Sequence, residues 1–309
     1  MLSIKTLDVE INKNGQNHLV SNNSITGTSL EVLSFMSSGI KKRSGSGTSE
    51  GRPGRINYYS EDEYRTISMT VEATAEDMQD IAHLRDAVNE LFDGEMFIRE
   101  MRIKDIKIEY ERPGERTGEL QLEAPEYVNG KQIKVTKVNS IEIDDATLKS
   151  VFTVEFETTE LPYFESIYTS LEIHDSGYDA TAEKYGLVDN IDDEKVQYRF
   201  TSNNFTVYNA GNVTVEPESM YLRIIASEVT SSNNFTIRNK TTGDEFVLKR
   251  ESKGSHVRLI GMVISMGSIT NVFRDTNRRF IRLAPGDNQF EVLNGTFTEI
   301  SFEFKQYYK

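Results

Sequence analysis

The class of fold is decided by the stretch Val151-Phe-Thr-Val-Glu-Phe-Glu157, in which apolar and polar side chains alternate from Phe152 onward. A period of two places alternate side chains on opposite faces of a β-strand, so one face of this segment is suited to a core. The same period recurs in three further segments, at Ile67, Met69, Val71; at Ile106, Ile108, Tyr110; and at Ile300, Phe302, Phe304. Strands are therefore predicted to dominate both halves of the chain.

Length and composition limit the possible protein classes. The chain has 309 residues and a formal net charge of −14, and at roughly 100 to 200 residues per domain this length predicts two domains. The absence of cysteine excludes disulfides, a thiol nucleophile and cysteine-ligated metal sites. The amino terminus lacks the apolar core of a secretory signal, and no apolar run approaches the ~20 residues of a membrane span. We therefore expect a soluble chain without membrane insertion.

One helix is expected, from about Ala75 to Phe92. Thr74 is a candidate N-cap because an acidic residue follows three positions later, and Gly94 is a candidate C-terminal stop. Apolar residues three or four apart form one stripe along this segment, which predicts a helix packed on a sheet. The stripe consists of Met78, Ile81, Leu84, Val88 and Leu91.

The segment from Gly39 to Arg55 is predicted to be a long loop, because it is rich in Gly and Ser and has almost nothing to bury. Within it, five basic residues stand against the single acidic residue Glu50, a local charge of +4. Loops of this length in a compact domain are usually functional or disordered.

A second break in the pattern lies near Glu165, where an acidic, weakly patterned stretch begins. We place the domain boundary there, with domains at 1–165 and 166–309. The first carries 19 basic and 30 acidic residues, a net charge of −11, and the second carries 16 and 19, a net charge of −3. Short alternating segments after Lys195 predict an antiparallel β-sandwich or jelly roll. These segments are 196–200, 205–208, 222–226, 235–237, 246–248, 257–263, 281–283, 290–293 and 297–304.

No set of residues indicates a catalytic site, a metal site or a cofactor. The histidines are His18, His83, His174 and His256. None has a metal-ligand spacing to another, and we interpret them as surface residues. The sequence around Ser49 matches G-x-S-x-G, but that motif needs a strand before it and a helix after it, and a flexible Gly/Ser stretch surrounds it here. Phosphate-binding glycine loops are missing, and the acidic charge opposes binding to nucleic acid.

Two segments of the second half carry a resemblance to a known family. They are Phe205-Thr-Val-Tyr-Asn-Ala-Gly-Asn-Val-Thr-Val-Glu-Pro217 and Arg282-Leu-Ala-Pro-Gly-Asp-Asn-Gln-Phe-Glu-Val292. As a pair they resemble the second-domain signature of siphophage distal tail (Dit) proteins from phages of Gram-positive hosts. The first half is similar to the same family in its long inserted loop, its single helix over a sheet and a closing strand that runs into Leu161-Pro-Tyr-Phe-Glu-Ser166.

The residues that carry this resemblance also have a simple structural interpretation as turn residues. Asn and Gly suit tight turns, and Pro ends a strand or starts a turn. We therefore expect them to shape the second domain rather than to touch a ligand. They are Asn209, Gly211, Asn212, Pro217, Pro285, Gly286 and Asn288.

The resemblance implies a mainly β fold. The first domain would be a β-sandwich or split-barrel-like domain with one helix and a long loop, and the second a galectin-like or carbohydrate-binding-module-like sandwich. It also implies a non-enzymatic structural protein of the virion tail tip, assembled in the host cytoplasm. The expected assembly is a homohexameric ring that joins the tail tube protein to a tail-associated lysin or fibre and to receptor-binding or other baseplate proteins. DNA would pass through its lumen without specific binding.

The basic loop has a role in such a ring. Copies of a domain with a charge of −11 repel one another unless positive segments cross their interfaces. We expect the basic residues of the loop to make these inter-subunit contacts. They are Lys41, Lys42, Arg43, Arg52 and Arg55.

Two other functions remain open on the sequence. The second domain could be a carbohydrate-binding module that grips host cell-wall polymers, which a ligand-dependent rise in melting temperature would favour. An enzyme, either a glycosidase or an esterase, is supported only by abundant carboxylates and by the match around Ser49.

Overall fold

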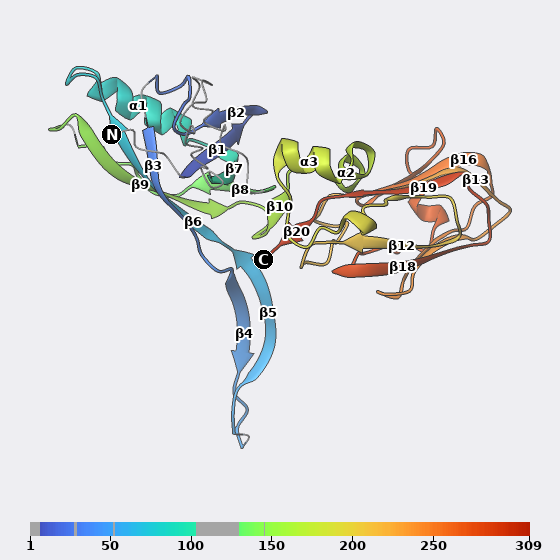
Figure 1. Ribbon diagram of the computed structural model, residues 1–309. Coiled ribbons are helices and arrows are strands. Elements are labelled where there is room, and N and C mark those ends of the chain that lie inside the picture. The colour runs from blue at the N-terminus through green and yellow to red at the C-terminus, as the bar shows by residue number, and fades with distance from the viewer. Residues whose placement is uncertain (1–6, 28–29, 52, 103–129, 145) are drawn as a thin grey trace, which may run out of the picture. The chain divides into compact units, whose positions relative to one another are not determined.

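The computed structural model describes residues 7–27, 30–51, 53–102, 130–144 and 146–309, which form two compact units (Figure 1). Unit 1 runs to Phe164 and includes Lys309, and unit 2 comprises Glu165–Tyr308. The expectation of a mainly β chain is confirmed in both units. The expected strand at 106–110 lies outside the described residues, as does Arg52. Among the described helices, none is long and apolar enough to cross a bilayer.

Unit 1 is built on an antiparallel sheet whose main path has the order β2-β1-β7-β8-β9-β6-β3. Its strands are β1 (Leu7–Lys13), β2 (Gln16–Leu19), β3 (Leu30–Ser37), β6 (Thr66–Thr74), β7 (Glu95–Arg102), β8 (Lys131–Lys137) and β9 (Lys149–Thr158). The alternation in β9 sets its register on β6, because the apolar side chains of both strands are buried on one face. The paired residues are Phe152, Val154 and Phe156 opposite Val71, Met69 and Ile67.

Helix α1 (Ile81–Leu91) packs on the buried face of this sheet. Its stripe at Ile81, Leu84, Val88 and Leu91 belongs to the same apolar core as the strands. Just beyond the helix, the ring of Phe92 meets that of Phe156 edge to face, with centroids 6.0 Å apart. Each fully buried apolar side chain contributes roughly 1.5–3 kcal/mol, so this stripe fixes the helix on the sheet.

The predicted start of the helix is wrong, because β6 continues through Thr74. Thr74 pairs with Lys149 of β9, and the backbone N–H of Ala75 donates to the carbonyl of Leu148 at 2.9 Å. A residue whose backbone is paired in a β-ladder cannot cap a helix. Asp77 instead organises a separate turn before the helix begins, accepting a hydrogen bond from the backbone N–H of Gln79. Met78, which was predicted to belong to the apolar stripe, lies in this turn and is 53% exposed. The predicted stop agrees with the structure, since Gly94 adopts a φ of 79° after the last turn.

The expected long loop is wrong over Lys41–Gly47, which forms one strand of a β-arm. Strand β4 (Lys41–Gly47) pairs antiparallel with β5 (Ile56–Tyr64), and the arm projects from the sheet of unit 1 (Figure 1). Tyrosines of β5 cover the glycines of β4: a Cβ on Gly47 would lie 2.7 Å from the Tyr58 hydroxyl, and one on Gly45 would overlap the ring of Tyr59. Aromatic rings that cover cross-strand glycines stabilise such a pair.

Unit 2 contains two antiparallel sheets, ordered β11-β19-β13-β16-β17 and β12-β18-β14-β15. Their strands are β11 (Arg199–Phe200), β12 (Asn204–Asn209), β13 (Leu222–Ser231), β14 (Phe235–Asn239), β15 (Asp244–Leu248), β16 (Ser252–Ile260), β17 (Val263–Met266), β18 (Gly286–Leu293) and β19 (Glu299–Phe304). Phenylalanines from both sheets meet in the core. The ring of Phe205 stacks on those of Phe200 and Phe290, with centroids 4.3 and 5.4 Å apart. The ring centroids of Phe290 and Phe302 are 4.7 Å apart.

Several segments of unit 2 differ from the predictions. The strand expected at 257–263 is broken by a turn at Gly261, whose φ is 53°, and the segment 281–283 forms only a bridge between Leu283 and Val215. The remaining short elements are β10 (Phe164–Ser166), β20 (Tyr307–Tyr308), η1 (Asp193–Lys195) and η2 (Phe273–Asp275).

Two helices, α2 (Ser170–Ser176) and α3 (Tyr178–Tyr185), occupy the stretch expected to be weakly patterned. A capping box starts α2: the Thr169 hydroxyl accepts from the backbone N–H of Glu172, and the Glu172 carboxylate accepts from that of Thr169. This Thr-x-x-Glu signal was present in the sequence and would have predicted the helix.

Candidate functional site

The basic residues of β4 are paired within the arm itself. Lys42 lies 3.2 Å from Asp62, and Arg43 lies 2.7 Å from Glu61. Lys41 stacks over a tyrosine ring at the end of β5, 4.5 Å from its centroid. The acidic residues of β5 that follow the expected loop lower the charge of the whole arm, residues 41–64, to +1. The predicted excess of positive charge is therefore largely neutralised by the partner strand.

The tip of the arm keeps an unneutralised charge. Arg55 is exposed and makes no ion pair with any residue in the described part of the chain. Arg52, the other basic residue predicted there, lies outside the described residues. Available positive charge is thus concentrated at the tip rather than along β4.

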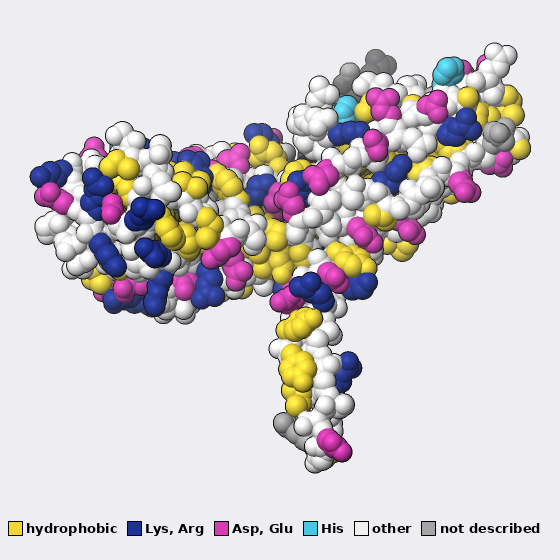
Figure 2. Space-filling view, turned by 180° about the vertical axis from the view of Figure 1, so that it is seen from behind, with side chains coloured by type: hydrophobic (Ala, Val, Ile, Leu, Met, Phe, Trp, Pro, Cys, Tyr) yellow, Lys and Arg dark blue, Asp and Glu magenta, His cyan; other side chains and the backbone are white. Residues whose placement is uncertain are grey.

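One face of the arm is aromatic. Tyr58 is 68% exposed and Tyr59 is 47% exposed, and a stripe of hydrophobic side chains runs along the arm in Figure 2. Exposed aromatic side chains with a polar tip are enriched in protein interfaces. The sequence analysis did not use these tyrosines, although the pair Tyr58-Tyr59 directly follows the basic segment.

The base of the arm is fixed to unit 1 by Asp62. Its carboxylate lies 2.8 Å from Nζ of Lys309 and 2.9 Å from the Tyr163 hydroxyl, in addition to its ion pair with Lys42. The hydrogen bond from Lys309, with further ones from Tyr163 and Lys42, outweighs burial and lowers the pKa of Asp62 to about 2. The adjacent Arg65 is buried, which lowers the pKa of its guanidinium, and lies 4.9 Å from the ring centroid of Phe164.

The face of the sheet opposite the core carries carboxylates over β3, β6 and β9, together with the exposed apolar side chains of Met36 and Val151. Glu31 and Glu72 lie opposite each other on β3 and β6, and Glu155 is exposed on β9. Lys149 brings a positive charge to this group, since its Nζ lies 2.7 Å from Oε1 of Glu72. Because α1 and the apolar core occupy the other face, these strands present carboxylates and hydroxyls outward, beside a few apolar side chains.

In unit 2, the structure brings two predicted turn residues into a buried amide network. Asn288 is fully buried, and its Oδ1 accepts from Nδ2 of Asn239 at 3.0 Å. Asn209 donates to the carbonyls of Val213 and Leu283 at 3.1 and 3.2 Å. The network ties the ends of β12, β14 and β18 to the loop before β18. Asn239 was missed by the sequence analysis, although it follows a predicted strand and precedes the turn Lys-Thr-Thr-Gly243.

Two other predicted residues, Gly211 and Gly286, occupy positions that favour glycine. Gly211 has no space for a side chain, since a Cβ there would lie 2.5 Å from the carbonyl oxygen of Tyr307. Gly286 has a φ of 82°, which favours glycine. Pro217 is buried, whereas Asn212 and Pro285 are exposed.

The described residues contain no group of three or more side chains suited to hold a metal ion. Ser49 lies at the tip of the arm, in the turn between β4 and β5. Strand β4 precedes it, but the next described element is strand β5 and not a helix, so the G-x-S-x-G match lacks the helix that a catalytic serine needs.

The fold as a whole resembles a known structure. SPP1 Dit, whose crystal structure is described as a paradigm of the hub adsorption apparatus in phages that infect Gram-positive bacteria, matches with a TM-score of 0.61 and 11% identity over 97% of this chain and 99% of that one. The chain has the fold of a phage Dit protein. Structures of the phage p2 baseplate in its activated conformation, with Sr and with Ca, also match over 97% of this chain, with TM-scores of 0.40 and 0.39 and identities of 11% and 12%. They are covered to 98% of their own length. No protein-family model and no curated protein matches the sequence.

Proposed function

We propose that this chain is a structural hub of a siphophage tail tip, where it forms a ring between the tail tube and the tail-associated lysin or fibre. The observation that carries the proposal is the match to SPP1 Dit, which spans both units rather than one sandwich alone. A hub needs surfaces that bind neighbouring proteins, which the arm can supply, and a lumen face that does not hold DNA, which the acidic sheet face can supply.

The acidic face of β3, β6 and β9 is suited to line the lumen of the ring. Carboxylates at Glu31, Glu72 and Glu155 would repel the phosphates of DNA, so that the genome passes without adhering. Thr70 and Thr153, whose hydroxyls lie 3.4 Å apart, add a polar surface without positive charge.

The arm is suited to cross the interface between neighbouring copies. Its exposed tyrosines provide apolar contact area, and Arg55 at the tip provides a free positive charge for an acidic neighbour. Because Lys42 and Arg43 already neutralise acidic residues of β5, their role in the ring is to keep the arm itself from repelling the next copy.

The ring is tested by size-exclusion chromatography with light scattering, followed by negative-stain electron microscopy. We expect a closed ring, with six-fold symmetry, either alone or after mixing with the tail tube protein of the same phage. A strictly monomeric chain under both conditions would refute the ring.

The arm is tested by replacing Lys41, Lys42, Arg43, Arg52 and Arg55 together with Ser. Ring assembly should weaken as the salt concentration is lowered, because repulsion between acidic copies is then less screened. An unchanged ring at low salt would show that the arm does not carry the contact.

Location in the virion is tested by labelling intact phage particles with an antibody against unit 2. Gold particles at the tail tip support the hub. Labelling of the capsid, or of cell extracts but not particles, contradicts it.

A further inference from the structure

Arg65 places a buried guanidinium at the base of the arm, between β5 and β6. The residue is 6% exposed. Its backbone is fixed in the sheet, since its N–H donates to the Thr158 hydroxyl and its carbonyl accepts from the N–H of Thr158, both at 3.1 Å. The ring centroid of Phe164 lies 4.9 Å from Cζ of the guanidinium. The sheet and the aromatic ring therefore hold this side chain in a defined place.

The hydrogen-bond donors of this guanidinium are poorly satisfied. Nη1 lies 3.5 Å from the Ser37 hydroxyl, at the limit of a hydrogen bond. Nε is buried without a partner, and neither an acceptor for Nη2 nor a carboxylate for an ion pair is found among the described residues. Asp62, the carboxylate that fixes the base of the arm, is already bound to Lys309. The hydroxyl of Thr159, just after β9, is a second buried group without a partner.

A cation in this position needs an anion. An unpaired charge is costly to bury. Burial lowers the pKa of the guanidinium, but arginine keeps its proton in proteins, so the cost is not removed by neutralisation. Contact with Phe164 offsets only part of it, because the ring attracts the charge but offers no oxygen to the N–H groups.

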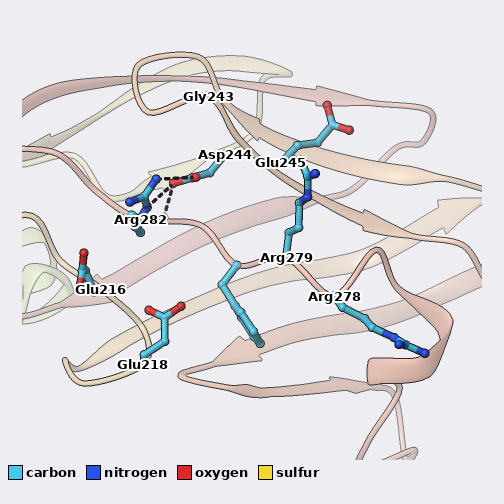
Figure 3. A pocket seen from close by; sticks show the side chains of 9 residues that line it. Glu216, Glu218, Gly243, Asp244, Glu245, Arg278, Arg279 and Arg282 are labelled. Atoms are coloured by element: carbon cyan, nitrogen blue, oxygen red, sulfur yellow. Dashed lines mark hydrogen bonds and ion pairs between the residues drawn. The ribbon is translucent and has the colours of Figure 1, made fainter.

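Other arginines of the chain show which group fits the unused side of Arg65. Nε and Nη2 form one side of a guanidinium and point two N–H bonds in parallel. Arg282 uses this side to bind both carboxylate oxygens of Asp244, at 3.1 and 3.0 Å (Figure 3). Arg199 binds both oxygens of Asp175 in the same way, at 3.2 and 3.1 Å. Both of these arginines are more exposed than Arg65, so the need for a partner is greater at Arg65.

We propose that Nε and Nη2 of Arg65 bind one carboxylate group. A carboxylate is planar, its two oxygens match the two parallel N–H bonds, and its single negative charge is the charge that one guanidinium neutralises. A phosphate dianion would bring excess negative charge into a buried position of an acidic unit. Two sources can supply the group: a small carboxylic acid in solution, or an aspartate or glutamate of a second copy of this chain.

This site goes beyond the hub role and does not depend on it. Arg65, Ser37 and Phe164 all belong to unit 1, so a single chain can bind a small acid whether or not a ring forms. Only the second source requires assembly, and there the carboxylate of one copy would be held at the arm base of the next. A failure of the ring would therefore leave binding of a small acid intact.

The test uses the full chain labelled with nitrogen-15 and follows the Nε–H resonances of its arginines by NMR. Sodium acetate is the probe, with sodium chloride and sodium phosphate at the same ionic strength for comparison. We expect a saturable shift of the Arg65 resonance with acetate, with a Kd on the order of 10 mM. The resonance is identified by its absence from the variant Arg65→Lys. This variant keeps the charge but lacks the parallel N–H pair, so it should lose the rise in melting temperature that acetate causes.

The matched control is Arg85→Lys, which changes an exposed arginine of α1. It should keep the response to acetate, and the Arg85 resonance of the unmodified chain should not shift. Crystals of the unmodified chain grown in acetate give a readout that needs no variant, because a carboxylate should lie on Nε and Nη2 of Arg65. Acetate in that place identifies a small acid as the source, whereas a side chain from a second copy of the ring identifies assembly, and either supports the site.

Three results would overturn the proposal. The first is an Arg65 resonance that acetate leaves unchanged, together with crystals that hold neither group on this side of the guanidinium. The second is a shift with chloride or phosphate as large as the shift with acetate. The third is a folded Arg65→Lys variant that keeps the full acetate response.

Discussion

Replacing Asn288 with Ala should destabilise unit 2 by about 3–5 kcal/mol, because its buried amide joins three parts of the sandwich. Oδ1 accepts from the backbone N–H of Ala284 at 2.9 Å and from Nδ2 of Asn239 at 3.0 Å. Nδ2 donates to the carbonyls of Ala284 and Gly286 at 2.7 and 3.1 Å. Each bond contributes about 0.5–1.5 kcal/mol net, and each buried polar group left unpaired costs about 1–3 kcal/mol. Loss of the four bonds therefore amounts to about 2–6 kcal/mol, and the expected range lies within it.

The assay is urea unfolding followed by near-ultraviolet circular dichroism, which reports tyrosine packing in a chain with 14 Tyr and no Trp. With a slope of about 1–3 kcal/mol per molar urea, the expected loss shifts the midpoint of the unit 2 transition by more than about 1 M. Asn203→Ala is the matched control, since Asn203 is exposed and its side chain makes no hydrogen bond within the described residues. It should change stability by less than about 0.5 kcal/mol.

A second substitution separates the donor and acceptor roles of this amide. Asn288→Asp keeps the acceptor oxygen but cannot donate to the carbonyls of Ala284 and Gly286, so it should also destabilise unit 2. The reasoning is refuted if Asn288→Ala lies within about 1 kcal/mol of the control. It is equally refuted if the Asp variant is as stable as the unmodified chain.

Three further predictions concern one or two positions each. Gly211→Ala should cost about 1–3 kcal/mol in urea unfolding because its Cβ meets the backbone of β20, whereas Gly39→Ala, which meets nothing within 4 Å, should cost little. Asp62, with its pKa lowered from 3.8 to about 2, should stabilise unit 1 by about 2 kcal/mol above pH 4. That stabilisation should be lost as the pH falls through 2, and Asp62→Asn should abolish this acid dependence. The double variant Tyr58→Ser/Tyr59→Ser should uncover the glycines of β4, so backbone hydrogen exchange should become faster in the arm and stay unchanged in α1. If the arm exchanges at the same rate in the variant as in the unmodified chain, the covering role is contradicted.

Errors in the sequence predictions came from partners that lie far along the chain. The arm was expected to be a loop because β4 contains only polar residues and glycine, and its pairing depends on tyrosines of β5 beyond the tip. The helix start was misplaced because the ladder between β6 and β9 extends through Thr74. In both cases a local propensity was overridden by strand pairing that local sequence does not encode.

The amide network of unit 2 could be predicted only in part from the sequence, because Asn239 looks like an ordinary turn residue in isolation. Asn209, Gly211 and Asn288 were singled out from residue type as turn residues, whereas the structure places Asn209 and Asn288 in strands β12 and β18.

The sequence by itself determined that the chain is mainly β and where its single long amphipathic stripe lies. These features depend on periodicity and on local backbone geometry, which are written in neighbouring residues. Only the tertiary structure decided which carboxylates share the outer face of the sheet, that β4 is a strand, and that the amide of Asn239 completes the network around Asn288. Those outcomes depend on which distant strands pair, because pairing sets the register that brings side chains together.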